Sequence, residues 1–214
     1  MVLKIYFIRN GETEANKASR TTVGGRSNDD ANLTDEGVSQ AKALANRFHE
    51  ENIEFDSIYI SPAIRAQQTA NYCIEAMNSN PPVVELKPAL LELSQGDWEG
   101  LQKEDVYKRR SVIENLKKDC WNFTPGNKIK GESQRMVSER IKKFVDKLVQ
   151  KHPNGRIALF THAYPIKFFL ANIFDLDKTT AYKIPVNETS ITVLRYENEE
   201  FKLVKQNDYS HLEN

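Results

Sequence analysis

An apolar run near the start of the chain, Ile-Tyr-Phe-Ile at residues 5–8, stops abruptly at Arg9, and Asn10, Gly11 and two polar residues follow. A continuous run of bulky apolar residues bounded by turn residues predicts a strand that is covered on both faces. In open α/β sheets, ligands bind just beyond the carboxyl ends of such strands. We therefore expect Arg9 to lie where a substrate binds. For an isolated Arg-x-Gly, the alternative is an arginine that closes the strand in a surface ion pair.

A second buried strand is predicted at residues 156–161, and it stops in the same way at His162. Of the four histidines, His49 and His152 lie at polar helix ends and His211 lies near the tail, so His162 is the one that terminates an apolar strand. A lone histidine at such a position is usually structural, with its hydrogen bonds satisfied. Together with Arg9 at the end of another strand, His162 becomes a candidate ligand-binding residue.

The remaining pattern alternates between strands and helices. Strands are predicted at residues 57–61 and 83–86, and residues 190–196 and 201–205 predict a closing hairpin. Helices are predicted at 38–48, 103–118, 137–149 and 165–174. Thr34 and Ser133 are expected as N-caps, and Ser61 and Pro62 as the N-cap and first residue of a further helix. This alternation predicts a three-layer α/β/α sandwich with a mostly parallel central sheet.

The bulk composition narrows the class of protein. A chain of 214 residues fits one well-buried domain. With 30 basic and 30 acidic residues the net charge is zero, so no global field favours nucleic acid or an anionic membrane. We expect a cytoplasmic protein, because no secretory leader or membrane-spanning run is recognisable, and Cys73 and Cys120 lie far apart, as reduced thiols do. No metal is expected, since Asp, His and Cys nowhere show ligand spacing.

Residues 9–13 resemble the Arg-His-Gly-Glu-Thr signature of the histidine phosphatase superfamily, also called the phosphoglycerate mutase-like family, with Asn16 at its usual place. Further stretches resemble the family's motifs in the same order over essentially the whole chain. They lie at residues 61–70, 90–100, 131–133, 161–163, where Ala163 replaces a glycine, and 207–212.

The resemblance implies a cofactor-free phosphate pocket and gives roles to particular residues. Arg9 and Arg65 would clamp the phosphate with Asn16 nearby, because a guanidinium can bind two oxygens and keeps its charge. His162 would donate a further hydrogen bond. Glu92 would be the proton donor for the leaving oxygen. The resemblance also implies that residues 101–130 form a cap-like insertion that covers the site and shapes specificity within a single domain, 1–214.

The environment of Glu92 can be read from its neighbours. Leu91 and Leu93 flank it, and partial desolvation between them would raise its pKa toward neutrality. An alternating edge strand with Glu92 facing water is the other reading.

Asn10 departs from the family pattern, because the nucleophilic histidine of the family falls on this position. An amide nitrogen has no basic lone pair, so asparagine can hydrogen-bond a phosphate but cannot attack phosphorus. The sequence thus predicts a phosphatase that acts on a small phosphorylated metabolite. Because of Asn10, we expect the chain as written to be inactive or very slow. An engineered or a natural origin of Asn10 stays open. The alternatives are a phosphate-binding pseudophosphatase and a phosphoglycerate mutase, and a homodimer is expected only because dimers are common.

Overall fold

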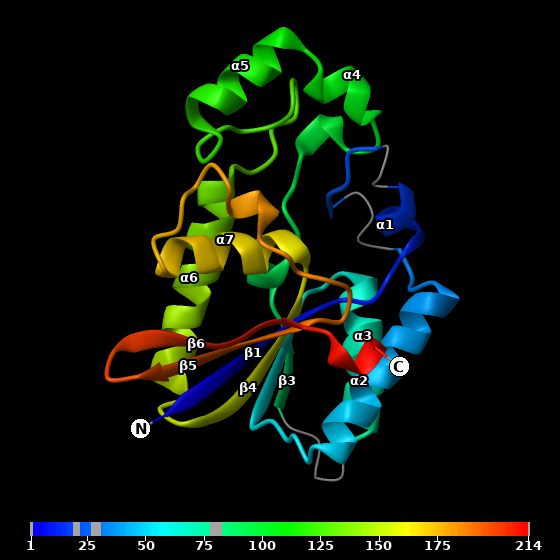
Figure 1. Cartoon of the computed structure of the whole chain (residues 1–214), viewed down its shortest axis with the longest axis vertical. Helices are drawn as coiled ribbons and strands as arrows, with labels where there is room; N and C mark the ends of the chain where they lie inside the picture. Colours follow the sequence, from blue (N-terminus) through cyan, green and yellow to red (C-terminus); the bar gives the residue numbers. More distant parts are fainter. Residues whose placement is uncertain (1, 19–21, 27–30, 78–82, 214) are drawn as a thin grey trace.

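The computed structural model describes residues 2–18, 22–26, 31–77 and 83–213. Strands and helices alternate around one central sheet, and a smaller helical part projects beyond one end of it (Figure 1). The strands are β1 (Leu3–Arg9), β2 (Ser57–Ile60), β3 (Val83–Leu86), β4 (Gly155–Thr161), β5 (Ile191–Glu197) and β6 (Glu200–Asp208). The α-helices are α1 (Glu14–Ala18), α2 (Asp35–Glu50), α3 (Ile64–Glu75), α4 (Lys103–Tyr107), α5 (Arg110–Asp119), α6 (Gln134–Lys151) and α7 (Ala163–Ile173).

The sheet has the strand order β3-β2-β4-β1-β5-β6. Strands β3, β2, β4 and β1 pair in parallel, whereas β5 runs antiparallel to both β1 and β6. The mostly parallel sheet is therefore confirmed. Arg9 pairs with Thr161 in the register of β1 and β4, so the last residues of both strands meet at one edge of the sheet.

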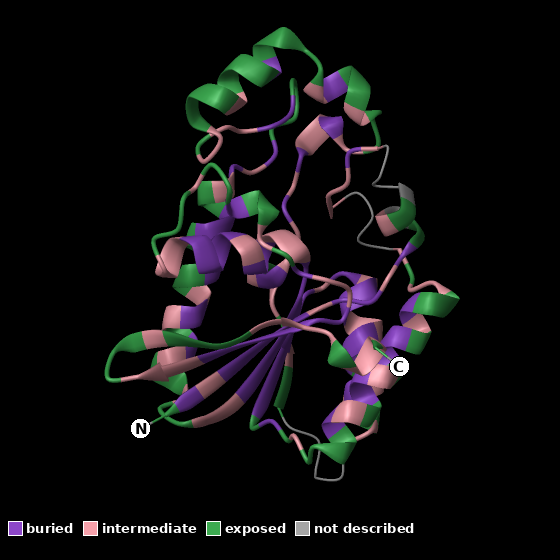
Figure 2. Ribbon diagram, in the orientation of Figure 1, coloured by how far each residue is buried: buried purple, intermediate pink, exposed green. Residues whose placement is uncertain are grey.

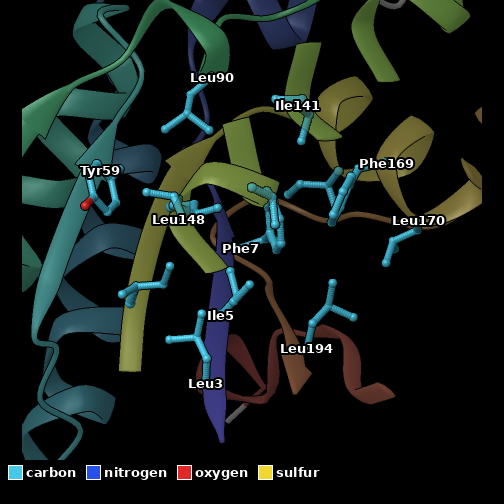
Figure 3. Close-up of a cluster of buried hydrophobic side chains, with 14 of the residues drawn as sticks. Leu3, Ile5, Phe7, Tyr59, Leu90, Ile141, Leu148, Phe169, Leu170 and Leu194 are labelled. Carbon is cyan, nitrogen blue, oxygen red and sulfur yellow. The ribbon is translucent and has the colours of Figure 1, made fainter. Parts of the chain in front are cut away.

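Helices cover both faces of the sheet, as the sequence predicts. Alternate residues of β1 divide between the two layers: Leu3, Ile5 and Phe7 pack with α6 and α7, whereas Tyr6 and Ile8 pack with α2 and α3. Figure 3 shows the first of these clusters. Because both faces are covered, the central strands are almost wholly buried (Figure 2) and read as unbroken apolar runs.

Two of the three expected helix caps are confirmed. The Thr34 hydroxyl oxygen accepts from the Gly37 amide, and the Ser133 hydroxyl oxygen accepts from the Met136 amide. The third is wrong: α3 begins at Ile64, two residues after Pro62, and its N-cap Ala63 makes no side-chain bond. The Ser61 hydroxyl oxygen accepts from the Ala63 amide at 3.4 Å and the hydroxyl is also hydrogen-bonded to His162, so Ser61 holds the turn before α3 rather than its first helical turn.

The region of the expected insertion forms the smaller helical part, which lies beyond the carboxyl ends of the parallel strands (Figure 1). The single helix expected at 103–118 is two helices, α4 and α5, which break at Lys108 and Arg109. A small apolar cluster of Val23, Trp98, Val106 and Val112 holds α4 and α5 to neighbouring loops. Within the described ranges, no helix is both long and apolar enough to cross a membrane.

Candidate active site

A cavity of about 520 Å³ opens at the carboxyl edge of the parallel strands. We call it the phosphate pocket. Every site residue that the sequence analysis singled out lines it, although these residues come from separate segments. They are Arg9, Asn10, Asn16, Arg65, Glu92 and His162.

Asn10 lies at the centre of a buried hydrogen-bond chain and is only 3% exposed. Its amide nitrogen donates to the Gly11 carbonyl oxygen at 2.8 Å, so its Oδ1 faces His162. An amide oxygen can only accept, and therefore His162 Nδ1 is the donor of the 2.8 Å bond between them. The Ser61 hydroxyl then donates to His162 Nε2, also at 2.8 Å. The Nδ1–H of His162 is thus donated to Asn10 in this structure, and the hydrogen bond that we expected His162 to donate to a phosphate stays a prediction.

His162 is a neutral imidazole in this environment. It is 1% exposed, and burial lowers the pKa of its ring well below the ordinary value. The charges of Arg65 and Arg9 act in the same direction. A neutral ring agrees with the bonding pattern, in which one nitrogen donates and the other accepts.

Glu92 lies in an irregular segment rather than in an edge strand, between the 3-10 turns Pro88–Leu90 and Gly96–Trp98. Burial raises the pKa of its carboxyl group, although the Leu93 amide and the charges of Arg65 and Arg9 act in the opposite direction. The Leu93 amide donates to Glu92 Oε1 at 2.8 Å. The expected direction of the shift is therefore confirmed, and a carboxyl group of this kind can hold a proton to higher pH.

Arg9 makes an ion pair and also lines the phosphate pocket, so its role in substrate binding stays a prediction. Its Nη2 lies 2.6 Å from Glu188 Oε1, and its Nη1 donates to the Val186 carbonyl oxygen at 2.6 Å. Both partners lie just before β5, which fixes the guanidinium beside the strand end. Arg65, from the first turn of α3, is 5% exposed. Two fixed cationic groups thus face one cavity.

The turn after β1 needs glycine because two backbone segments approach closely. A Cβ at Gly11 would lie 2.7 Å from the Gly37 carbonyl oxygen. Beyond this contact, Asn16 Oδ1 accepts from the Thr13 amide at 2.9 Å and from the Thr13 hydroxyl at 2.6 Å. The turn that carries Asn10 and Asn16 is therefore held against the start of α2.

A family model of the histidine phosphatase superfamily (branch 1) matches residues 5–209. The chain belongs to the histidine phosphatase superfamily. Phosphoserine phosphatase 1 of Hydrogenobacter thermophilus is 26% identical over 214 aligned residues, which cover 99% of this chain and 95% of the relative.

Solved structures share the fold of this chain. A mutant phosphoserine phosphatase of Entamoeba histolytica, in complex with phosphoserine, has a TM-score of 0.81 at 26% identity, over 98% of this chain and 99% of that one. YhfR of Bacillus stearothermophilus has a TM-score of 0.82 at 24% identity, over 99% of this chain and 100% of that one.

In this member of the superfamily, the sequence analysis missed residues in and next to the pocket. Ser61, which bonds to His162 but does not line the cavity, was assigned to a helix cap, and no local signal pointed to this bond. Lys103 and Lys167 add positive charge to the lining, and Tyr107 and Tyr164 add aromatic surface. Burial lowers the pKa of Lys167, and the charge of Arg9 lowers it further. Among the residues that line the described cavity, Glu92 is the one acidic side chain. The cationic side chains are those of Arg9, Arg65, Lys103 and Lys167.

A cluster beside Glu92 was also missed. The Glu92 carbonyl oxygen accepts from Arg26 Nε at 2.8 Å and from Arg140 Nη2 at 3.2 Å. Glu132 joins the two arginines, with its Oε2 2.6 Å from Arg26 and its Oε1 2.9 Å from Arg140. The only sequence signal was the match of residues 131–133 to a family motif, which gave Glu132 no role. These three side chains fix the main chain that carries the Glu92 carboxyl group.

The described residues include no group of three or more His, Cys, Asp or Glu side chains that could hold a metal ion. Arginine and lysine side chains line the pocket and give it positive charge. The first residues of α7, Ala163 and Tyr164, also line it, and the start of a helix favours negative charge.

Proposed function

We propose that this chain is a phosphatase-type protein that binds the phosphomonoester of a small metabolite in the phosphate pocket, and that Asn10 makes its turnover as written inactive or very slow. The observation that carries this proposal is the convergence of Arg9, Arg65, Glu92 and His162 around Asn10 in one cavity. The phosphoserine phosphatases among its relatives support the substrate class.

The charges of the pocket suit a phosphate ester. Phosphoryl transfer depends mostly on positioning and on positive charge around the phosphate oxygens. In our proposal Arg9 and Arg65 bind those oxygens, and Asn16 orients the ester. Arg65 is held buried near the start of α3, so little reorganisation is needed when the anion arrives.

Glu92 is proposed as the proton donor to the leaving oxygen. Its raised pKa keeps the carboxyl group protonated to higher pH than an exposed glutamate, and the phosphate dianion would raise that pKa further through like-charge repulsion. Protonation of the leaving oxygen matters most for alkyl esters, whose alkoxides are poor leaving groups.

The nucleophile is the missing part of the proposed reaction. A histidine at position 10 would attack phosphorus, release the protonated alcohol and leave a phosphohistidine for water to hydrolyse. The Asn10 amide nitrogen has no lone pair for that attack and is already bonded to the Gly11 carbonyl oxygen.

A second candidate is a pseudophosphatase that recognises a phosphorylated ligand without turnover. The specific observation in its favour is that Asn10 fits its place, with the amide nitrogen bonded to Gly11 and Oδ1 bonded to His162. Because both polar atoms of the Asn10 side chain have hydrogen-bond partners, an asparagine at this position is compatible with a natural binding site.

The test compares the chain as written with Asn10→His. Phosphate release from p-nitrophenyl phosphate and a panel of metabolites is measured for both, and phosphate binding is measured by calorimetry. Turnover by Asn10→His alone supports the phosphatase proposal. Phosphate binding without turnover by either protein favours the pseudophosphatase, and absence of phosphate binding refutes both. Clean isomerisation of 3-phosphoglycerate, without phosphate release, would instead assign a mutase.

A further inference from the structure

A second cavity, also about 520 Å³, adjoins the phosphate pocket on the side of α5. We call it the side chamber. Side chains from several separate segments line it, among them Leu93, Ile113, Leu116, Phe123 and Phe168. The two cavities share Gln95, Tyr107, Tyr164 and Tyr182 in their linings, so the chamber continues directly from the phosphate pocket.

The surface of the side chamber is mainly apolar, whereas that of the phosphate pocket is polar and apolar in similar parts. Its charged lining residues are Lys117 and Glu132. Lys117 is exposed to solvent, and Glu132 is already paired with Arg26 and Arg140. A charged substituent that left water for this chamber would find few groups to replace its hydration.

Aromatic side chains connect the two cavities. The rings of Tyr164 and Phe168 are stacked, with centroids 5.3 Å apart and planes 11° apart, and Tyr164 lines both cavities. On the shared boundary, the Tyr107 hydroxyl donates to Gln95 Oε1, and Gln95 Nε2 donates to the Gly24 carbonyl oxygen at 3.1 Å. These polar atoms of Tyr107 and Gln95 already have partners. Among the other lining residues, Gln134 Oε1 is buried without a hydrogen-bond partner in the described part of the chain, so one acceptor interrupts the apolar wall.

We propose that the side chamber binds the alcohol part of the substrate and that this part is apolar, an alkyl or aryl group rather than a charged one such as the serine of phosphoserine. This inference rests on the proposed phosphate pocket, which would hold the other end of the same molecule. The chamber volume falls within the range of about 300–1,000 Å³ that is usual for small-molecule sites. A phosphate anchored by Arg9 and Arg65 would present its ester group to the Tyr164 ring and the chamber beyond it.

The first experiment is calorimetry on the full chain as written, with inorganic phosphate, methyl, butyl and hexyl phosphate, and phosphoserine. Each methylene that enters the chamber should raise the affinity about fourfold, so hexyl phosphate, with five more methylenes, should bind up to roughly 1,000-fold more tightly than methyl phosphate. Phosphoserine should bind no more tightly than methyl phosphate. The slow turnover expected of Asn10 allows these esters to be titrated without hydrolysis.

A matched pair of variants tests the location. Ile113 lines the side chamber and is 36% exposed, so Ile113→Glu introduces a carboxylate there with little risk to the fold. Ile129 belongs to the same insertion, is 67% exposed and is not among the lining residues of the described cavities, so Ile129→Glu is the control. We expect Ile113→Glu to weaken hexyl phosphate about tenfold or more and to leave inorganic phosphate nearly unchanged. The control should leave both affinities unchanged.

The outcomes separate this inference from the proposed function. Equal affinities for methyl and hexyl phosphate, with phosphate binding intact, would overturn the apolar chamber and leave the phosphate pocket standing. Phosphoserine binding more tightly than hexyl phosphate would also overturn it. Absence of phosphate binding would overturn the proposed function, and the chamber proposal with it.

Discussion

Replacing Glu132 by Gln removes the negative charge shared by two arginines beside Glu92. Its Oε1 accepts from Arg140 Nε at 2.9 Å, and its Oε2 accepts from Arg140 Nη2 at 3.1 Å and from Arg26 Nη2 at 2.6 Å. The same arginines donate to the Glu92 carbonyl oxygen. We therefore expect Glu132→Gln to lower the stability of the fold and to loosen the segment that carries the proposed proton donor.

The magnitude follows from how far the cluster is buried. Removing one partner of a fully buried pair costs about 3–5 kcal/mol, whereas an exposed pair contributes about 0.2–1 kcal/mol. The side chains of Glu132, Arg140 and Arg26 are 15%, 19% and 31% exposed, which lies between these cases. We expect the free energy of unfolding to fall by about 2 kcal/mol. For a chain of this length, that corresponds to a decrease in Tm of about 4–8 °C.

The effect should depend on pH in a defined direction. Burial alone would raise the pKa of Glu132, but the hydrogen bond and charge of Arg140, with the charge of Arg26, hold it below the ordinary value. A carboxyl group with a lowered folded-state pKa stabilises the fold above its unfolded value of about 4.3. That stabilisation is lost as pH falls through the folded value, so the difference between the two proteins should be full at pH 7 and smaller at pH 3.

The assay is urea unfolding followed by circular dichroism at pH 7 and near pH 3, with thermal melts alongside. Glu139→Gln is the control, because Glu139 is 61% exposed and lies 3.7 Å from Arg135 on the same helix. It should change the free energy of unfolding by less than about 0.5 kcal/mol. The reasoning is refuted if Glu132→Gln behaves like this control at pH 7, or if its effect is equally large at both pH values.

Four further predictions address the reaction and the fold. In an Asn10→His background, Glu92→Gln should slow hydrolysis of alkyl phosphates by about 10²–10⁴-fold, and p-nitrophenyl phosphate, with its better leaving group, much less. In that background with Glu92 intact, alkyl ester hydrolysis should decline as pH rises through the raised pKa of Glu92, because the donor loses its proton, and a pH–rate profile checks this. Gly37→Ala should destabilise the fold by about 3 kcal/mol in urea unfolding, since the added Cβ would lie 2.1 Å from a backbone oxygen. Asp208→Asn should destabilise at pH 7 by about 1–2 kcal/mol and less below pH 4, because Arg47 holds the pKa of Asp208 below its ordinary value.

Much of the fold was predictable because its signals are local. The apolar runs that stop at Arg9 and His162 are strands covered by helices on both faces, and their register brings the two strand ends together. Thr34 and Ser133 cap their helices through bonds to residues three positions further on. Patterns of this kind depend on the chain within a few residues, so they can be read without the fold.

The predictions that failed lie at places with contacts to distant residues. Ser61 had the local signature of an N-cap, but its hydroxyl accepts from the Ala63 amide in the turn before α3 and also bonds to His162, 101 residues away. A helix expected to continue from 103 to 118 breaks at Lys108 and Arg109, where apolar contacts to neighbouring loops position α4 and α5 separately. In both places the side chains have partners that only folding brings near, and a pattern within a few residues does not reveal them.

The sequence by itself determined the layered fold, the family and the residues around the phosphate pocket. The reason is that strand ends and family motifs can be recognised from the order of residues within short stretches of the chain. Only the tertiary structure decided that Glu132 joins Arg26 and Arg140 beside Glu92, and that α5 and α7 enclose an apolar chamber. Both features consist of side chains from segments far apart in sequence. The chemistry of both features depends on the distances between these side chains and on their burial. No short pattern of residues in the sequence encodes these two properties.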